Sequence, residues 1–437
     1  MQSQRGFVSF ERASKETNAV VSRLLAAKPL VSLRAASVET SLLVASRLDT
    51  SQLMTTGQTI TINNERYDIS NAVSYHYGNF PPENIEIERI FNSLTSALEQ
   101  ITRYDEKLQN IPNSELLLAP LRQRDAVVSS RMEGTISTLE EVLRLEASAS
   151  ASRAEEGTRS DTIEVSLYAR ALRQAEIAIS DGYRISEHLI KSAHQTLLSY
   201  GRGAEKNPGE YKSQQNYVGD RRARRVDFIP ISPERLQGGM RSLFEFIRND
   251  VQHSLIKVAI AHAEFEALHP FDDGNGRVGR MLIPLMLWQQ GSLSAPHFFV
   301  SDFFDRNKDE YIDRLRQVSL SNDWTGWCSF FLNGLEAQAR SNIAVVSQIQ
   351  GHHEEARIRF REILRSQHFQ AAVDYMFANP VFWNNHFVEA ANAPASTLRN
   401  FTPRLVEAGW LEVIVAPSGR SPGLYAFPSL LRILEDH

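Results

Sequence analysis

The chain has 437 residues, a formal net charge of −5 and a single cysteine. Its length predicts two to four domains that each bury a core, and its 42% hydrophobic and 23% charged residues are ordinary for a soluble protein. The negative charge argues against nucleic-acid binding by the chain as a whole. A lone cysteine excludes an internal disulfide framework and favours a reducing compartment. Because we find neither a signal-peptide core nor an apolar run of ~18 residues, we expect a cytoplasmic protein with no membrane span.

Residues 1–80 form an N-terminal extension with few clear signals. Residues 59–69 predict a β-hairpin that turns at Asn63-Asn64. Residues 75–80 are rich in aromatic side chains, for which we expect core packing, with a partner-binding surface as the alternative.

Residues 81–150 are predicted to be a helical region. Ser129 and Glu133 lie four residues apart and therefore on one helix face. Apolar residues at helical spacing, from Met132 through Ile136 to Leu143, predict that one side of this helix is buried. The alanine- and serine-rich start of residues 147–160 predicts a flexible linker or loop.

Residues 160–345 are predicted to be the central domain. Residues 209–230 predict a β-hairpin around an arginine-rich tip at residues 221–225. For this tip we favour a solvated turn or a docking site for an acidic target over a nucleic-acid patch. The apolar spacing of residues 255–263 predicts an amphipathic helix that leads to His269.

The most distinctive stretch is residues 269–280, HPFDDGNGRVGR. The Gly-Asn-Gly sequence at 274–276 predicts a turn that opens a buried helix, whose first N–H groups and positive dipole end suit an anion. Arg277 and Arg280 lie on neighbouring faces of the first helical turn, where their guanidinium groups can grip further phosphates.

Three side chains before the turn complete a candidate reactive site. Asp273 is placed for a magnesium ion that bridges phosphates. His269 suits a general base, because the pKa of histidine lies near neutral pH. Phe271 is expected to be a hydrophobic anchor for the loop. Polyphosphate, metal, two arginines and a base together indicate transfer of a group onto a hydroxyl.

Residues 350–437 differ in character and predict a further domain. A helix over 397–408, kinked by Pro403, is followed by two strands within 409–427, an arrangement that resembles a winged helix. Residues 351–437 contain eight arginines, no lysine and nine acids, whereas a DNA reader should be more basic. We therefore favour a protein-contact or homodimer role over DNA binding.

Residues 269–280 match the Fic-domain signature, HPFx(D/E)GNGRxxR, at every fixed position. The likeness covers roughly residues 80–345, including the helix before the signature and the segments 299–311 and 323–327. This resemblance implies a mainly α fold, with a Fic-type helical core and a β-hairpin flap. The C-terminal winged-helix-like (α+β) domain would follow it.

The resemblance also implies an activity, protein adenylyltransfer, in which AMP moves from ATP to a serine, threonine or tyrosine hydroxyl of a target protein. His269 would be the catalytic base, and Asp273 would hold Mg²⁺. The residues that would bind ATP are Gly274, Asn275, Gly276, Arg277, Val278, Gly279 and Arg280, with Asn307 and Tyr311 at the base or ribose.

Residues 129–134, SSRMEG, resemble the inhibitory motif of that family, (S/T)xxxE(G/N), which begins here at Ser129. In the family the glutamate pairs with the last arginine of the signature, so Glu133 would take Arg280 from the γ-phosphate of ATP. Gly134 would let the helix approach the nucleotide site closely.

The hairpin at 209–230 resembles the flap of the family, whose edge holds the target segment by strand addition. Lys212 stands where we expect arginine in many relatives, and this departure weakens any bidentate contact there.

Three other functions stay open at this point. The transferred group could be another nucleotide. The same site could remove AMP from a modified protein, with Glu133 aligning a water molecule. Alternatively, the chain is chiefly a winged-helix regulator with little catalysis.

Overall fold

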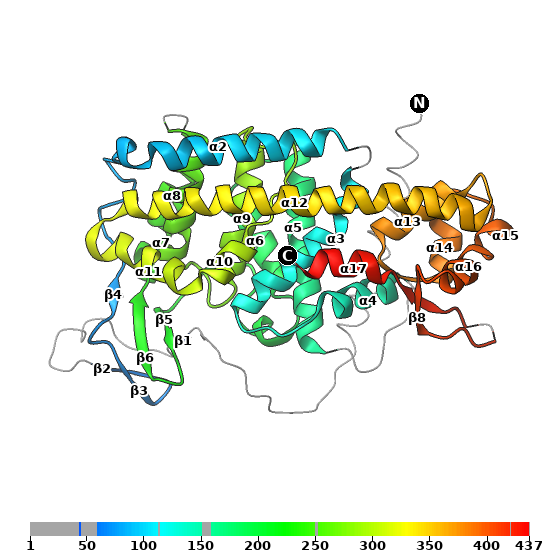
Figure 1. Cartoon of the computed structure of the whole chain (residues 1–437). Coiled ribbons are helices and arrows are strands. Elements are labelled where there is room, and N and C mark those ends of the chain that lie inside the picture. Colours follow the sequence, from blue (N-terminus) through cyan, green and yellow to red (C-terminus); the bar gives the residue numbers. More distant parts are fainter. Residues whose placement is uncertain are drawn as a thin grey trace.

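The computed structural model describes residues 43–44, 59–111, 114–150, 159–249, 252–419 and 421–436. Most of these residues lie in helices, with two small sheets at the periphery (Figure 1). Part of the predicted linker at 147–160 is helical, because α4 (Leu139–Ser150) extends into it. The rest of that linker, residues 151–158, lies outside the described residues.

Two long helices, α2 (Ile87–Gln109) and α12 (Trp324–Leu364), pack side by side along one face of the molecule (Figure 1). Helix α2 buries residues that recur at intervals of three, four and seven, as expected for one face of an α-helix. These residues are Ile90, Ala97, Ile101, Tyr104 and Leu108.

The central pair of helices is α8 (Ser254–Leu268) and α9 (Asn275–Gln289), which pack against each other and are buried on nearly all sides. The other helices of this region are α5 (Ser160–Ser180), α6 (Glu187–Leu197), α7 (Pro233–Arg248), α10 (Ser301–Arg306) and α11 (Lys308–Ser321).

In the described part of the chain, no helix combines the length and apolar character needed to cross a membrane.

The continuous apolar face predicted from Met132 to Leu143 is wrong. Helix α3 (Ser114–Met132) ends where Gly134 adopts a φ of +83°, and α4 begins only at Leu139. A positive φ suits glycine and stops a right-handed helix, so the chain changes direction at this point. Ile136 lies in the connection and is 55% exposed.

Six strands form one sheet beside the helices: β1 (Leu43–Val44), β2 (Thr59–Ile62), β3 (Glu65–Asp68), β4 (Val73–Ser74), β5 (Asn216–Asp220) and β6 (Arg225–Ile229). Their order is β1-β5-β6-β3-β2, with β4 paired to β6. Both predicted hairpins are confirmed, because β2 pairs antiparallel with β3 and β5 pairs antiparallel with β6. Asn63 and Asn64 both have positive φ angles, as a tight two-residue hairpin turn requires.

The C-terminal region contains α13 (Phe369–Ala378), β7 (Val381–Trp383), α14 (Asn384–Ala390), α15 (Ala395–Leu398), α16 (Phe401–Glu407), β8 (Glu412–Val415), β9 (Leu424–Ala426) and α17 (Pro428–Glu435). The two predicted strands are confirmed as β8 and β9, and β7 completes a sheet of order β7-β9-β8. No strand was predicted at the position of β7. The winged-helix assignment stays a prediction.

The single kinked helix predicted over 397–408 is wrong, because the chain forms two short helices, α15 and α16. Pro403 lacks the N–H that would bond the carbonyl of Arg399, so a helix cannot continue across that point. Pro403 instead lies in the first turn of α16, where a missing N–H costs little.

Helix α12 crosses residues 345–350, where we predicted a domain boundary, and joins the two regions in one piece. The larger of two clusters of buried apolar residues extends from Tyr75 to Leu434, and the smaller one lies in the six-stranded sheet. The C-terminal region also packs on α3 and α4, and the Trp383 indole donates a 3.4 Å hydrogen bond to Ser148 Oγ. The C-terminal helices and sheet therefore share a core with the rest of the chain.

This shared core predicts that Phe360→Ala destabilises the whole protein by about 3–5 kcal/mol, the usual cost of deleting a buried phenyl ring. Phe360 is fully buried on α12, and its ring lies 5.2 Å from that of Trp410. Ile358→Ala on the same helix is the control and should change stability by less than about 0.5 kcal/mol, because Ile358 is 60% exposed. Urea unfolding followed by fluorescence and circular dichroism measures both. Equal stability of the two variants would contradict the shared core.

Candidate active site

A short loop joins α8 to α9 and carries the predicted reactive residues. His269 ends α8 with a φ of +46°, and Gly274 precedes α9 with a φ of +76°. Asn275 closes the loop, because its Oδ1 accepts a 2.9 Å hydrogen bond from the Phe271 N–H and its Nδ2 donates a 2.8 Å bond to the Phe271 carbonyl. The Asn275 side chain is therefore committed to shaping the loop, and its predicted contact with ATP stays a prediction.

A residue that the sequence did not reveal, His194 on α6, supports the loop from outside. Its ring stacks on Phe271 at a centroid distance of 3.7 Å. Its Nδ1 accepts a 2.8 Å hydrogen bond from the Gly209 N–H, so Nε2 carries the proton and donates to the Asp273 carbonyl at 2.9 Å. Burial lowers the pKa of His194 to about 4, so the ring stays neutral. Phe271 is fully buried, in the anchor position predicted for it.

His269 has the features of a general base. Its Nδ1 lies 3.2 Å from the Glu266 carbonyl, which fixes the proton on Nδ1 and leaves a lone pair on Nε2. Nε2 is buried and has no hydrogen-bond partner among the residues that the structure describes. Burial, and then the nearby charge of Lys212, lower the pKa of His269 to about 4. The imidazole ring is therefore neutral at neutral pH, with its one proton on Nδ1, and Nε2 is able to accept a second proton.

Arg277 offers hydrogen-bond donors that the protein leaves unused. Only 3% of the residue is exposed, and its Nη2 contacts Asp273 Oδ1 at 3.4 Å. Its Nε and Nη1 are buried and find no partner in the described part of the chain. Unpaired cationic donors at the N-terminus of a buried helix form a site for an anion such as phosphate.

Asp273 fits the predicted magnesium site. Its Oδ1 accepts a 2.5 Å hydrogen bond from the Gly274 N–H, whereas Oδ2 has no bond to any described residue. Among the described residues no group of three or more His, Cys, Asp or Glu side chains could hold a metal ion. One carboxylate together with substrate phosphates is a usual environment for Mg²⁺, so Asp273 is the residue that would hold it.

Ser129, Glu133 and Arg280 meet as predicted. Arg280 Nε donates to Ser129 Oγ at 2.9 Å, and its Nη2 donates to the Ser129 carbonyl at 2.9 Å and to Glu133 Oε1 at 2.7 Å. Burial raises the pKa of Glu133, but Arg280, followed by Arg277 and Lys308, lowers it more, so the pKa lies below its ordinary value. The pair is therefore ionised, and it fills the donors of Arg280 that face α3.

The Glu133 carboxylate also lies against the turn at the start of α9. A Cβ atom added at Gly276 would meet Glu133 Oε1 at 2.3 Å and Arg280 Nη1 at 2.9 Å. The close approach that we expected at Gly134 is therefore made at Gly276, while Gly134 ends α3. A side chain at position 276 would therefore displace the Glu133 carboxylate or the Arg280 guanidinium, so the turn and the glutamate occupy adjoining space.

Three other predicted ATP ligands, Val278, Gly279 and Tyr311, lie inside the protein, and Asn307 is half-buried. Val278 is 1% exposed, and a Cβ at Gly279 would meet Glu266 Oε1 at 2.2 Å, so these residues allow α9 to pack on α8. The Tyr311 hydroxyl contacts His262 Nε2 at 2.9 Å in the core. Asn307 Nδ2 donates a 2.8 Å bond to the Phe303 carbonyl. Contacts of Asn307 and Tyr311 with the base or ribose stay predictions.

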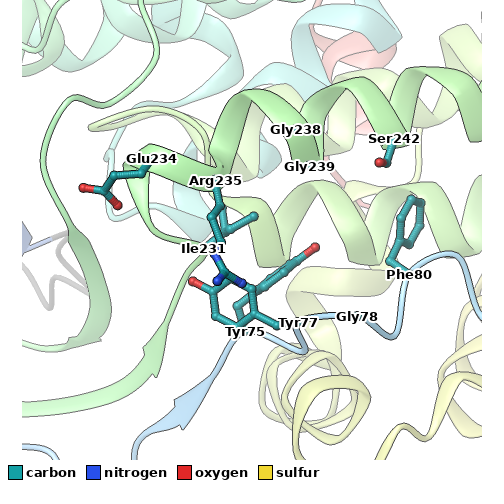
Figure 2. Close-up of a pocket in the computed structure, with 10 residues that line it drawn as sticks. All are labelled: Tyr75, Tyr77, Gly78, Phe80, Ile231, Glu234, Arg235, Gly238, Gly239 and Ser242. Atoms are coloured by element: carbon teal, nitrogen blue, oxygen red, sulfur yellow. The ribbon is translucent and has the colours of Figure 1, made fainter.

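A hollow of about 380 Å³ lies near the base of the flap, between residues 75–80 and α7 (Figure 2). Tyr75 is buried, and its hydroxyl donates a 2.7 Å bond to Glu264, which confirms core packing for this part of the aromatic segment. Tyr77 is 43% exposed and lies 4.9 Å from the Arg235 guanidinium at the wall of the hollow. A Cβ at Gly239 would meet the side chain of Leu268, so the wall of the hollow touches the residue before His269.

Together these features define a class of protein: a helical fold whose central helix pair presents an unprotonated histidine beside an anion-binding helix end. Residues 184–287 match the Fic/DOC family, and residues 91–176 match the Fic/DOC family N-terminal region. A Fido domain-containing protein of Dictyostelium discoideum is 32% identical over 111 residues, which are 25% of this chain and 69% of that protein. The chain belongs to the Fic/DOC family.

Relatives with a named activity match a smaller part of their own length. A probable protein adenylyltransferase of Aquifex aeolicus is 35% identical over 135 residues, covering 31% of this chain and 37% of the relative. Protein adenylyltransferase fic-1 of Caenorhabditis elegans is 29% identical over 119 residues, covering 26% and 20%. The crystal structure of a Fic family protein from Desulfovibrio desulfuricans covers 79% of this chain and 98% of its own, with a TM-score of 0.51 and 24% identity, and so shares the fold.

The contrast between the two arginines of α9 generates a stability prediction. Arg277→Met should stabilise the nucleotide-free protein by about 1–3 kcal/mol, because it removes buried donors that lack partners. Arg280→Met is the matched change one turn away and should destabilise by about 1–3 kcal/mol, because it leaves the Glu133 carboxylate without its partner. Thermal unfolding without nucleotide measures both, and destabilisation by Arg277→Met would show that its donors are satisfied.

Proposed function

We propose that this protein transfers AMP from ATP to a serine, threonine or tyrosine hydroxyl of a target protein. The observation that carries this proposal is the unprotonated, unpaired Nε2 of His269, in the same loop that leads to the unused donors of Arg277. A base without an anion site, or an anion site without a base, would not favour transfer onto a hydroxyl. The two relatives named as protein adenylyltransferases agree with this reaction.

The reaction balances with groups on this chain. The target hydroxyl gives its proton to His269 Nε2, and its oxygen forms a bond to the α-phosphorus of ATP. The bond between the α-phosphorus and the oxygen of the β-phosphate breaks, and pyrophosphate leaves. Arg277 and the first N–H groups of α9 bind phosphate oxygens and neutralise charge as it develops. Mg²⁺ held at Asp273 would add further neutralisation of the phosphates.

We further propose that Glu133 inhibits this reaction. Its carboxylate holds Arg280 at 2.7 Å and adjoins Gly276, so it occupies the arginine that a γ-phosphate would need. The Glu133 side chain is 32% exposed, whereas that of Arg280 is 3% exposed, so the glutamate is the partner with room to withdraw.

A second candidate function is removal of AMP from a modified protein. Glu133 remains ionised beside the catalytic loop, and an ionised carboxylate is able to orient a water molecule for attack on phosphorus. This reading gives Glu133 a positive role in catalysis, which is the opposite of inhibition.

The first test of transfer removes the base. His269→Ala should lower incorporation of label at least ~100-fold, because general bases contribute roughly 10²–10⁴-fold. Binding of ATP, measured by calorimetry, should persist. A panel of α-labelled nucleoside triphosphates identifies the group that is transferred. Equal activity of the variant and the wild type would exclude His269 as the base.

The second test concerns inhibition. Glu133→Gly should raise automodification by up to about a hundredfold. A change of this size is expected if nearly all wild-type molecules hold the inhibited arrangement, in which Glu133 pairs with Arg280, and the variant loses it. Adding His269→Ala should abolish the gain. Arg131→Ala is the control. Arg131 lies two residues before Glu133, its side chain is 56% exposed, and the change removes its ion pair with Asp305. A lower signal in folded Glu133→Gly protein would instead support AMP removal.

A further inference from the structure

Two residues outside the signature, Lys212 and Asn216, bind the backbone of the catalytic loop, which joins α8 to α9. They bond the carbonyls of four consecutive residues, 268–271. The Lys212 N–H donates to the Pro270 carbonyl at 2.8 Å, and Lys212 Nζ donates to the Leu268 carbonyl at 3.1 Å. Asn216 Nδ2 donates to the carbonyls of His269 and Phe271, each at 3.0 Å.

These bonds meet a need that helices and strands do not. Residues 268–271 begin at the last residue of α8, and the left-handed conformation of His269 takes the loop out of regular hydrogen bonding. Buried carbonyls require donors, so the loop depends on side chains from elsewhere in the chain. Lys212 is 4% exposed and Asn216 is fully buried, so water does not substitute for them freely.

The two side chains also fix each other. Lys212 Nζ donates a 2.7 Å hydrogen bond to Asn216 Oδ1. That bond sets which end of the Asn216 amide is the acceptor, and Nδ2 must then face the loop. The orientation of the Asn216 donor therefore depends on Lys212, and the position of the His269 carbonyl depends on both.

Asn216 is at the same time the first residue of β5, at the base of the flap. The backbone of β5 pairs with β1 at Val44↔Asn216 and Leu43↔Tyr217, so this edge of β5 accepts a strand from another part of the chain. One residue thus has its backbone at a strand-accepting edge and its side chain on the carbonyl of His269.

We infer that Lys212 and Asn216 are positioning residues, which hold His269 in its reactive conformation and link it to the strand-accepting edge of β5. The expected effect on adenylyl transfer rests on the proposed function, whereas the contacts of Lys212 and Asn216 do not. Neither residue touches the reacting atoms in this arrangement. Their effect reaches the chemistry through the backbone of His269, and displacement of a reactive group by about 1 Å costs on the order of 10²-fold in rate.

The pKa of His269 provides a measurement that is independent of transfer, because it depends on the charges around the ring. Lys212, Glu133 and the Glu266 carbonyl all influence the His269 ring, and the charge of Lys212 lowers its pKa. Burial lowers the pKa of Lys212 to about 7, and the nearby charge of Asp272 opposes this shift. Removing the lysine charge should therefore raise the pKa of His269.

The test uses the full chain with Glu133→Gly, in which transfer is expected to be fast. Lys212→Met should lower kcat roughly 10–100-fold with less than a twofold change in the KM for ATP, and Lys212→Arg should restore most of the rate. Asn216→Asp, which replaces the donating amide with an acceptor, should lower kcat to a similar extent. Lys191→Met is the control, because Lys191 pairs with Glu187 and Glu210 and lies over the Tyr211 ring. Among the described residues it makes no hydrogen bond to the carbonyls of residues 268–271.

A second measurement keeps the inference testable if no transfer is seen. In histidine-labelled protein, NMR titration should show a higher pKa for His269 in Lys212→Met and an unchanged pKa in Lys191→Met. Absence of transfer by every variant, with this shift present, would overturn the proposed function and support the positioning role. An unchanged His269 titration, or a Lys212→Met protein with undiminished kcat, would overturn the positioning role.

Discussion

The rest of the structure depends on one constraint: two buried helices, α8 and α9, are joined by a loop that is itself buried except at Asp273. Its backbone polar groups must be paired inside the protein, because an unpaired buried group costs about 1–3 kcal/mol. Asn275 pairs both backbone groups of Phe271, and His194 holds the carbonyl of Asp273. The carbonyls of residues 268–271 are bonded from the base of the flap. The loop is consequently rigid before any substrate binds.

Because the backbone is satisfied, the groups that remain unsatisfied are informative. His269 Nε2 and two nitrogens of Arg277 are buried without partners. Stability alone gives no reason to keep such groups, and they suit a reacting hydroxyl and a phosphate. Arg280 lies one turn further along α9 and is the opposite case, because α3 and Glu133 already satisfy it. The two arginines of one helix turn thus differ in whether the protein itself fills their hydrogen bonds.

The C-terminal region is connected to this arrangement through α3 and α4, the helices on either side of Glu133. Helix α3 contacts α9 on one side and α13 and α17 on another. Helix α4 contacts β7, where the Trp383 indole bonds Ser148. Helix α12 supports both regions along one face of the molecule (Figure 1). The packing of the C-terminal region therefore bears on the same helices that place Glu133 against Arg280.

Features encoded within a few consecutive residues could be predicted from the sequence. The turn at 274–276, the hairpins at Asn63-Asn64 and β5–β6, and helix α8 follow from local conformational preferences and apolar spacing. The contact between Glu133 and Arg280 was predicted through the family resemblance, not from spacing. The break at Gly134 and the restart at Pro403 were present as local signals, but apolar periodicity across them suggested continuous helices. The tertiary structure decided the role of His194, the bonding role of Lys212 and Asn216, and the interior position of Tyr311. The partner of a buried polar group depends on which distant elements pack together, and no local pattern records that choice.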